Sequence, residues 1–366
     1  MSGSEQQAFA LGRLIPTHWD GPYNRLQQSD LHSNHQFGFF MVFEFTVHPT
    51  FNFLSSFAER LKVPVLRNRL IIPASLGEGY IKKIDIEPDL KFVMHHYTLN
   101  EDFHLKRAAS EEKNDLISIV FNSNEIPTSL SPDRQSAIQF LKTNGSAIQI
   151  ASSSLGTETF FPAHSEVYFG VIGIKNWLLA SLLRLEKPNS LMDAILSGGT
   201  LFFYHESMLP DAQRVLKQLS EINEQNELDH LYYRIKVQEL LYILFSKLSH
   251  RETERQSPIN KADIEKLYAI RTAIIADLSI PPRLSELAEM AGMSETKMKQ
   301  LFKQVFGDSI YNYYQKTRME EAAFLLKQAG YSVSEVGYQL GFSNLSHFGR
   351  LFEKHHGSTP KKYSLA

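Results

Sequence analysis

The feature that most constrains this chain is an internal repeat within its last hundred residues. Residues 284–294 match residues 333–343 position by position, at a constant offset of 49, and beyond this stretch the offset becomes 50. The matched pairs are Leu284/Val333, Leu287/Val336, Ala288/Gly337, Ala291/Leu340, Gly292/Gly341, Met293/Phe342, Ser294/Ser343, Met298/Phe348, Leu301/Leu351, Phe302/Phe352, Gly307/Gly357 and Tyr313/Tyr363. Such a repeat predicts two copies of one supersecondary unit.

Each copy predicts a helix, a tight turn and a second helix. Apolar residues at i, i+3 and i+7 give the first helix one buried face, and the small residue Ala288 or Gly337 lets the second helix cross closely. Gly292 and Gly341 can adopt the positive φ that ends a helix. The residues suited to cap helix starts are Ser294, either Ser343 or Asn344, and the S-x-x-E pair Ser332 and Glu335. We therefore expect two helix-turn-helix motifs, at about 284–305 and 332–355.

From about Ile264 to Tyr363 the chain resembles the AraC/XylS family of transcription regulators. The most specific stretch is residues 341–360, GFSNLSHFGRLFEKHHGSTP, and residues 313–326, which include Arg318, look like the family's long connecting helix. The departures are Gly337 where the family usually has Ala, Arg283 where a Ser or Thr cap is common, and Leu345 and Gly349 at positions that are more often polar or larger. The resemblance implies a regulator that binds double-stranded promoter DNA and works with RNA polymerase. The alternative is a helical protein-interaction domain with a coincidental pattern.

The apolar side of each second helix identifies the opposite side as the one for DNA. Met298, Leu301 and Phe302 should face inward in the first motif, and Phe348, Leu351 and Phe352 in the second. The predicted DNA-binding residues are Thr296, Lys299, Gln300 and Lys303, and Ser346, His347, Arg350 and Lys354, with Glu295 and Leu345 also outward. The resemblance implies that Thr296, Lys299 and Gln300 read bases. Arg350 can reach guanine or phosphate, and Lys303, Lys316, Lys354, Lys361 and Lys362 are phosphate candidates or solvated surface.

The N-terminal half has strand patterns instead of helical ones. After an irregular segment, 1–36, short β-branched and aromatic runs recur between turn signals at Phe39–Val47, Tyr80–Ile86, Phe92–Thr98, Phe103–Ala108, Leu116–Phe121, Ala147–Ala151 and Glu166–Ile172. Many short strands predict a β-sandwich or barrel over 37–175. The fold class expected for the whole chain is therefore α+β, and the resemblance implies a cupin-like jelly-roll sensor for this half. Phe39, Phe43, Phe92, Tyr97 and Phe121 could line a cavity for a small-molecule effector, or form ordinary core.

Helical patterns follow over 176–250, at Trp177–Leu185, Ala212–Ile222 and Leu231–Leu248. In the last of these, Leu231, Ile235, Val237, Leu240, Leu241 and Leu244 approximate a stripe with a 3.6-residue period. The resemblance implies that such a helix pairs two subunits in a homodimer. A polar, charged stretch over 251–260 predicts a linker to the DNA-binding domain, 261–366.

Composition and the absence of certain motifs limit where the protein can act and what it can bind. The chain has no cysteine, no apolar run of membrane-spanning length and no secretory leader, so we expect a cytoplasmic protein without membrane association. The net charge is −2, whereas Lys261 onward has 14 basic and 11 acidic side chains, which suits a polyanion. His95 and His96 are adjacent on a strand and must face opposite sides, so we expect no metal site. The sequence has neither a G-x-x-x-x-G-K-S/T loop nor a G-x-S-x-G elbow, so we expect no cofactor and no enzyme. A DNA-binding protein that answers to a protein partner instead of a ligand stays open.

Overall fold

In the computed structural model, Phe40–Ala366 belong to one compact unit. The structure describes residues 40–47, 51–108, 115–123, 146–153, 155–197, 201–222, 226–251, 257–327 and 331–365. The predicted irregular segment 1–36 and the cavity candidate Phe39 lie outside the described residues.

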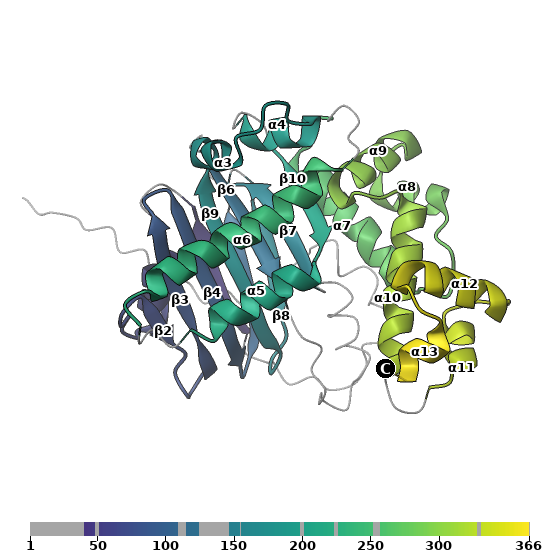
Figure 1. Ribbon diagram of the computed structural model, residues 1–366, viewed down its shortest axis with the longest axis horizontal. Helices are drawn as coiled ribbons and strands as arrows, with labels where there is room; N and C mark the ends of the chain where they lie inside the picture. Colours follow the sequence, from purple (N-terminus) through teal and green to yellow (C-terminus); the bar gives the residue numbers. More distant parts are fainter. Residues whose placement is uncertain are drawn as a thin grey trace, which may run out of the picture. The chain divides into compact units, whose positions relative to one another are not determined.

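The N-terminal half contains two β-sheets (Figure 1). A three-stranded sheet has the order β1-β5-β8, with β1 and β5 parallel, and a seven-stranded antiparallel sheet has the order β10-β7-β6-β9-β4-β3-β2. The strands are β1 Phe40–Thr46, β2 Arg69–Ile71, β3 Gly77–Glu87, β4 Leu90–Leu99, β5 Asp102–Ala108, β6 Leu116–Asn122, β7 Ala147–Ser152, β8 Thr157–Phe161, β9 Glu166–Lys175 and β10 Phe203–Ser207. All seven strands predicted from the sequence are present, while β2, β8 and β10 were not predicted.

Both faces of the seven-stranded sheet carry buried apolar side chains. Along β4, Phe92 and Met94 belong to one buried cluster, and Tyr97 and Leu99 belong to a second cluster on the other face. The second cluster also contains residues of α1 (Phe53–Leu61), such as Phe57, and of the three-stranded sheet. The side-chain period of two thus divides one strand between two cores.

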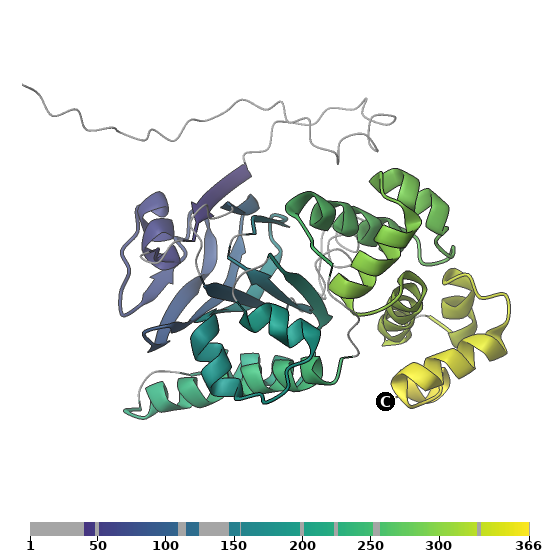
Figure 2. The same ribbon diagram turned by 90° about the horizontal axis from the view of Figure 1, so that it is seen from above.

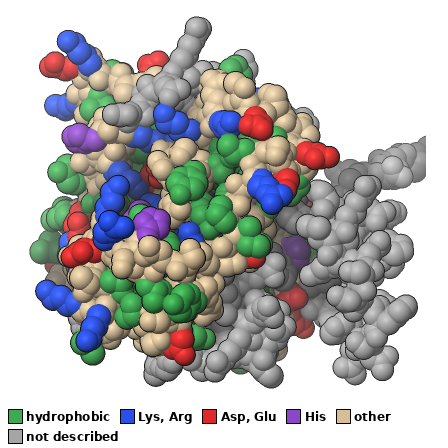
Figure 3. Space-filling model, turned by 90° about the vertical axis from the view of Figure 1, so that its right-hand side faces the viewer, with side chains coloured by type: hydrophobic (Ala, Val, Ile, Leu, Met, Phe, Trp, Pro, Cys, Tyr) green, Lys and Arg blue, Asp and Glu red, His purple; other side chains and the backbone are tan. Residues whose placement is uncertain are grey.

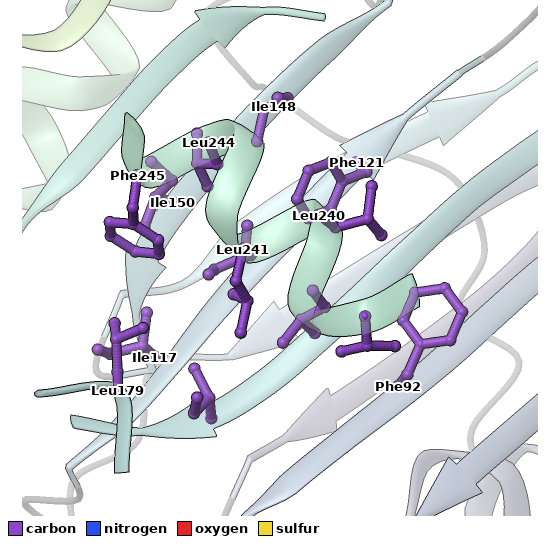
Figure 4. Close-up of a cluster of buried hydrophobic side chains, with 14 of the residues drawn as sticks. Phe92, Ile117, Phe121, Ile148, Ile150, Leu179, Leu240, Leu241, Leu244 and Phe245 are labelled. Carbon is purple, nitrogen blue, oxygen red and sulfur yellow. The ribbon is translucent and has the colours of Figure 1, made fainter. Parts of the chain in front are cut away.

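Helices cover the first face. These are α3 Asn176–Leu183, α4 Ser190–Leu196, α5 Pro210–Ser220 and α6 Asp229–Ser249. Figures 1 and 2 show α5 and α6 across the sheet, and Figure 4 shows Leu240, Leu241, Leu244 and Phe245 of α6 above sheet residues such as Phe121. One core therefore spans the ranges 37–175 and 176–250 that the sequence treats separately.

Strand β10 corrects the expectation that residues 176–250 are helical throughout. It lies between α4 and α5 in the chain and pairs antiparallel with β7, as the edge strand of the seven-stranded sheet. Its five residues, FYHES, include the polar residues His205, Glu206 and Ser207, so the strand has no apolar alternation to reveal it. Pairing with β7, more than fifty residues earlier, makes this segment a strand.

Seven helices follow the linker in the described residues: α7 Lys261–Ala276, α8 Leu284–Ala291, α9 Glu295–Phe306, α10 Ile310–Lys327, α11 Val333–Gln339, α12 Leu345–His356 and α13 Pro360–Leu365. Their buried side chains form a single cluster, which α7 to α12 all enter. The chain is thus mixed α and β, with a β-rich N-terminal half and a helical C-terminal part. Within the described ranges, no helix is both long and apolar enough to cross a bilayer.

Candidate nucleic-acid interface

The first predicted motif is formed by α8, a tight turn and α9. The turn residue Gly292 has φ 56°, the left-handed conformation that glycine favours. Ser294 then caps α9, because its hydroxyl accepts a hydrogen bond from the Lys297 amide. At the start of α8, Arg283 provides no side-chain cap and instead pairs with Glu286 at 2.8 Å.

The second motif is formed by α11, a turn and α12. Ser332 and Glu335 complete the predicted capping box, with the Glu335 amide 3.2 Å from the Ser332 hydroxyl and the Ser332 amide 2.7 Å from the Glu335 carboxylate. These hydrogen bonds lower the pKa of Glu335. Gly341 has φ 76°, and Asn344, of the two capping candidates, accepts from the His347 amide at the start of α12.

Arg318 joins the connecting helix α10 to the second turn. The side chain is buried, and its Nε donates to the carbonyl oxygen of Leu340 at 2.7 Å, next to Gly341. Its guanidinium carbon also lies 3.6 Å from the centre of the Phe342 ring. The sequence placed Arg318 on the connecting helix without a role, because its partners lie beyond the end of that helix.

The connecting helix α10 contacts α7, α9, α11, α12 and α13. The buried residues of both motifs, including Phe302 and Phe348, belong to the same cluster as those of α10. Dense packing of this kind resists independent movement of its parts. The two recognition helices α9 and α12 are therefore carried on one rigid core.

The predicted inward and outward sides agree with the structure. Met298, Leu301, Phe302, Phe348 and Phe352 are buried, and Leu351 is half-buried. All eight predicted DNA-binding residues are exposed: Thr296, Lys299, Gln300 and Lys303 on α9, and Ser346, His347, Arg350 and Lys354 on α12. Figure 3 shows Lys and Arg side chains with His between them along one side of the face that it presents.

Leu345, which the sequence left on the DNA side, packs against the first helix of its own motif. A methyl group added at Gly337 would lie 2.6 Å from Leu345 Cδ2, so the leucine fills the space of the missing side chain. Two of the departures from the family pattern, glycine at 337 and leucine at 345, therefore compensate each other.

Three outward-facing candidates have intramolecular partners. Lys299 pairs with Glu295 at 2.8 Å, one turn earlier on α9. Gln300 Nε2 donates to the Ser257 hydroxyl at 2.6 Å. Lys316, a predicted phosphate contact, is half-buried and donates to the Ser207 hydroxyl of β10 at 2.6 Å. In this arrangement Lys316 binds the N-terminal half, which the sequence could not show because β10 was not recognised.

In the N-terminal half, the aromatic residues proposed as a cavity lining separate into two groups. Phe43 and Tyr97 lie in the cluster between the sheets, whereas Phe92 and Phe121 lie in the cluster under α6 (Figure 4). They cannot line one cavity, because β4 turns neighbouring side chains to opposite faces.

His95 and His96 face opposite sides, as expected from their adjacency. His95 is buried against Phe169, with ring centres 4.1 Å apart, and burial lowers its pKa from 6.5 to about 3. His96 pairs with Glu166 at 3.0 Å on the other face. The two imidazoles therefore cannot bind one ion together.

A family model described as a helix-turn-helix domain matches residues 287–365. An uncharacterised HTH-type transcriptional regulator of Haemophilus influenzae is 34% identical over 97 residues, which cover 26% of this chain and 33% of that protein. The HTH-type transcriptional activator Btr of Bacillus subtilis is 32% identical over 137 residues, which cover 37% of this chain and 24% of Btr. A solved structure of an AraC-type transcriptional regulator from Chromobacterium violaceum is 28% identical, covers 29% of this chain and 95% of its own, and has a TM-score of 0.27.

The matched region thus corresponds to a quarter to a third of the length of these two curated relatives. The residues that the family model matches, 287–365, extend from α8 to α13 and contain both motifs. Residues 287–365 therefore form an AraC-type helix-turn-helix domain, and through this domain the chain is related to DNA-binding transcription regulators.

Proposed function

We propose that this protein is a sequence-specific transcription regulator of the AraC type, controlled by a small molecule that binds its N-terminal half. The observation that carries the proposal is that α9 and α12 share one buried core while each exposes a polar side. A recognition helix needs such a side to enter the major groove. Residues 261–366 would bind DNA, residues 37–250 would sense the effector, and 251–260 would connect them.

Base reading would be divided between the two helices. Thr296, Lys299 and Gln300 would read one stretch of major groove from α9, because Lys can donate to guanine and Gln can bond an adenine edge twice. Ser346, His347 and Arg350 would read a second stretch from α12, about one helical turn or 34 Å away along the DNA. Lys303 and Lys354 would hold phosphates. RNA polymerase at the promoter is the expected protein partner, and the cytoplasm the expected place of action.

The test is a competition experiment with the full chain, in which random duplexes compete with promoter fragments. Replacing Arg350 by Ala should weaken binding to the preferred duplex by about 1–3 kcal/mol if Arg350 reads a base, with little change on random DNA. The matched control is Arg214→Ala, because Arg214 is also an exposed arginine, but on α5, where it pairs with Asp211. Absence of any preferred fragment for the unaltered chain would refute the proposal. An equal loss on specific and random DNA would assign Arg350 to phosphate.

A homodimer formed through α6 is also part of the proposal. The buried side of α6 carries Val237, Leu240, Leu241 and Leu244, but Leu231 and Ile235 of the predicted stripe are 50% and 51% exposed, and Tyr242 is 71% exposed. These apolar side chains, one to two turns apart, suit a second copy of the helix. Two linked DNA-binding domains would also gain affinity, since the second contact becomes intramolecular.

Light scattering tests the dimer. We expect about twice 41.9 kDa for the unaltered chain and a monomer for Ile235→Arg. Ile280→Arg is the control, because Ile280 is similarly exposed, at 64%, but lies outside α6. A monomer at tens of micromolar with and without DNA would rule the dimer out.

For the effector, we propose the space between the two sheets, within the cupin-like arrangement that the family resemblance implies. His95 Nδ1 and the Tyr97 hydroxyl are buried there without a hydrogen-bond partner among the described residues, and their rings lie 6.0 Å apart on one face of β4. Unsatisfied buried polar atoms are costly, so a bound molecule that bonds to both would be stabilised. A metabolite screen by thermal stabilisation should give a ligand whose effect is lost in Tyr97→Phe, with Tyr80→Phe as the control. A ligand whose effect survives in Tyr97→Phe would place the site elsewhere.

A further inference from the structure

Ser257, within the linker 251–260, is hydrogen-bonded to the outward side of α9. Its hydroxyl accepts from Gln300 Nε2 at 2.6 Å. Its amide donates to Gln304 Oε1 at 2.9 Å, and its carbonyl accepts from Gln304 Nε2 at 3.0 Å. One residue thus makes three hydrogen bonds to two glutamines that lie one turn apart on the first recognition helix.

Arg251, the first residue of the linker, binds the end of the same helix. Its Nη2 donates to the carbonyl oxygens of Lys303 and Gln304, at 2.8 Å each. Carbonyls in the last turn of a helix lack partners within the helix and carry its negative dipole end, so a guanidinium is favoured there. The Arg251 guanidinium also lies over Gly307, where an added methyl group would come within 3.3 Å of it.

Arg251 connects this helix end to the sheet of the N-terminal half. Its Nη1 pairs with Glu206 of β10 at 2.6 Å, and Glu206 also pairs with Lys247 of α6 at 2.8 Å. The side chains of Glu206 and Arg251 are only 7% and 12% exposed. A buried charge that loses its partner is strongly destabilising, so movement of β10 would displace Arg251 and the end of α9 with it.

The second motif has no equivalent contact in the described part of the chain. Gly357, the repeat counterpart of Gly307, has open space where an added methyl group would lie. The exposed candidates of α12, including Arg350, make no hydrogen bond to Arg251 or Ser257. The two copies of the repeat therefore differ in their connection to the N-terminal half.

We propose that Arg251 and Ser257 form an α9 clamp that competes with DNA for the first recognition helix, and that Glu206 couples this clamp to the N-terminal half. The proposal rests on the proposed base-reading role of α9. Ser257 lies 2.6 Å from Gln300 Nε2 on the outward side of α9, which is the side that a base edge would have to approach. Ser257 and DNA therefore compete for the same side of the helix. Because Ser257 belongs to the same chain, its effective concentration is high and weak bonds suffice to compete.

The clamp lowers DNA affinity by the fraction of molecules in which it is closed. One hydrogen bond contributes about 0.5–1.5 kcal/mol, which corresponds to an affinity change of about two- to tenfold. Opening the clamp by substitution should therefore tighten DNA binding, which is the opposite of the result for loss of a DNA contact.

The experiment measures Kd by fluorescence anisotropy for the full chain and the duplex that the unaltered chain prefers. Ser257→Ala and Gln304→Ala should each bind the duplex about two- to tenfold more tightly. Ser257→Thr, which keeps a hydroxyl, should bind like the unaltered chain. Glu206→Gln should tighten binding as Arg251→Ala does, and the double variant should add little, because both act through one contact.

Unchanged or weaker binding by both Ser257→Ala and Gln304→Ala, with unaltered far-ultraviolet circular dichroism, would overturn the clamp. So would tighter binding by Ser257→Thr to the same extent as Ser257→Ala. A failure of the proposed function is distinguishable, because the unaltered chain would then prefer no duplex at all.

Discussion

The two turn glycines, Gly292 and Gly341, occupy the same position in the repeat, yet we expect very different effects when each is replaced by Ala. Both have a positive φ, at 56° and 76°. A side chain in this conformation costs about 1–2 kcal/mol. At Gly292 the added methyl group would meet only Lys266 Nζ, at an ordinary contact distance of 3.8 Å. Gly292→Ala should therefore destabilise the protein by about 1–2 kcal/mol.

At Gly341 the same methyl group would lie 2.0 Å from the carbonyl oxygen of Ser279. The backbone at Ser279 is held in place, because the Ser279 amide and hydroxyl both donate to the Asp277 carboxylate, at 2.8 and 2.6 Å. Overpacking of a tight contact costs about 1–3 kcal/mol in addition to the backbone term. We expect Gly341→Ala to cost about 2–5 kcal/mol in total, a large share of the stability of an ordinary domain.

Urea unfolding followed by circular dichroism at 222 nm would measure the free energy of unfolding of each variant. Hydrogen exchange of the amides in α11 and α12 would show whether the loss is local to the second motif. Gly292→Ala is the matched control, since it shares the backbone conformation but lacks the close contact. Losses that agree within about 0.5 kcal/mol would refute the argument from the Ser279 contact.

Three further outcomes are expected. Gly337→Ala should be less destabilising in a Leu345→Ser background, with a coupling of about 1 kcal/mol in a double-mutant cycle of unfolding free energies. Additive effects would refute the compensation between glycine at 337 and leucine at 345. Arg318→Lys should lower the free energy of unfolding by about 1–3 kcal/mol, because lysine cannot bond the Leu340 carbonyl and stack on the ring together; unchanged stability would count against this role. Burial holds the pKa of His95 near 3 in the folded protein, so below pH 6.5 the unfolded chain binds a proton that the folded protein does not. The free energy of unfolding therefore decreases as the pH is lowered. Between pH 7.5 and 5.5 this loss should be about 1.4 kcal/mol greater in the unaltered chain than in His95→Leu, and an equal loss in both would contradict it.

The sequence by itself determined the local features of the C-terminal part. The repeat predicted two helix-turn-helix motifs, and the structure has them as α8 with α9 and α11 with α12. The turn glycines, the Ser294 cap and the capping box at Ser332 are present as predicted. These features depend on residues within one or two turns of each other, and a periodic pattern records such neighbours directly.

In the N-terminal half, the sequence predicted seven strands but neither their partners nor β10. A buried polar strand such as β10 carries no alternation, and only its pairing with β7 decides its conformation. The same limit applies to α6, where Leu231 and Ile235 are apolar but exposed, while Tyr233, between them, is buried in the cluster that includes sheet residues. Periodicity identifies an apolar side, but not how much of it another element covers.

Only the tertiary structure decided which equivalent residues differ in their surroundings. Gly292 and Gly341 have the same place in the repeat, but only Gly341 lies against a backbone carbonyl from outside its motif. Gln300 was predicted to read a base, and Lys316 to hold a phosphate or to be solvated, yet Gln300 bonds Ser257 and Lys316 bonds Ser207. These partners are 43 and 109 residues away in the chain. Their proximity depends on how whole elements pack together, and no pattern of nearby residues encodes that.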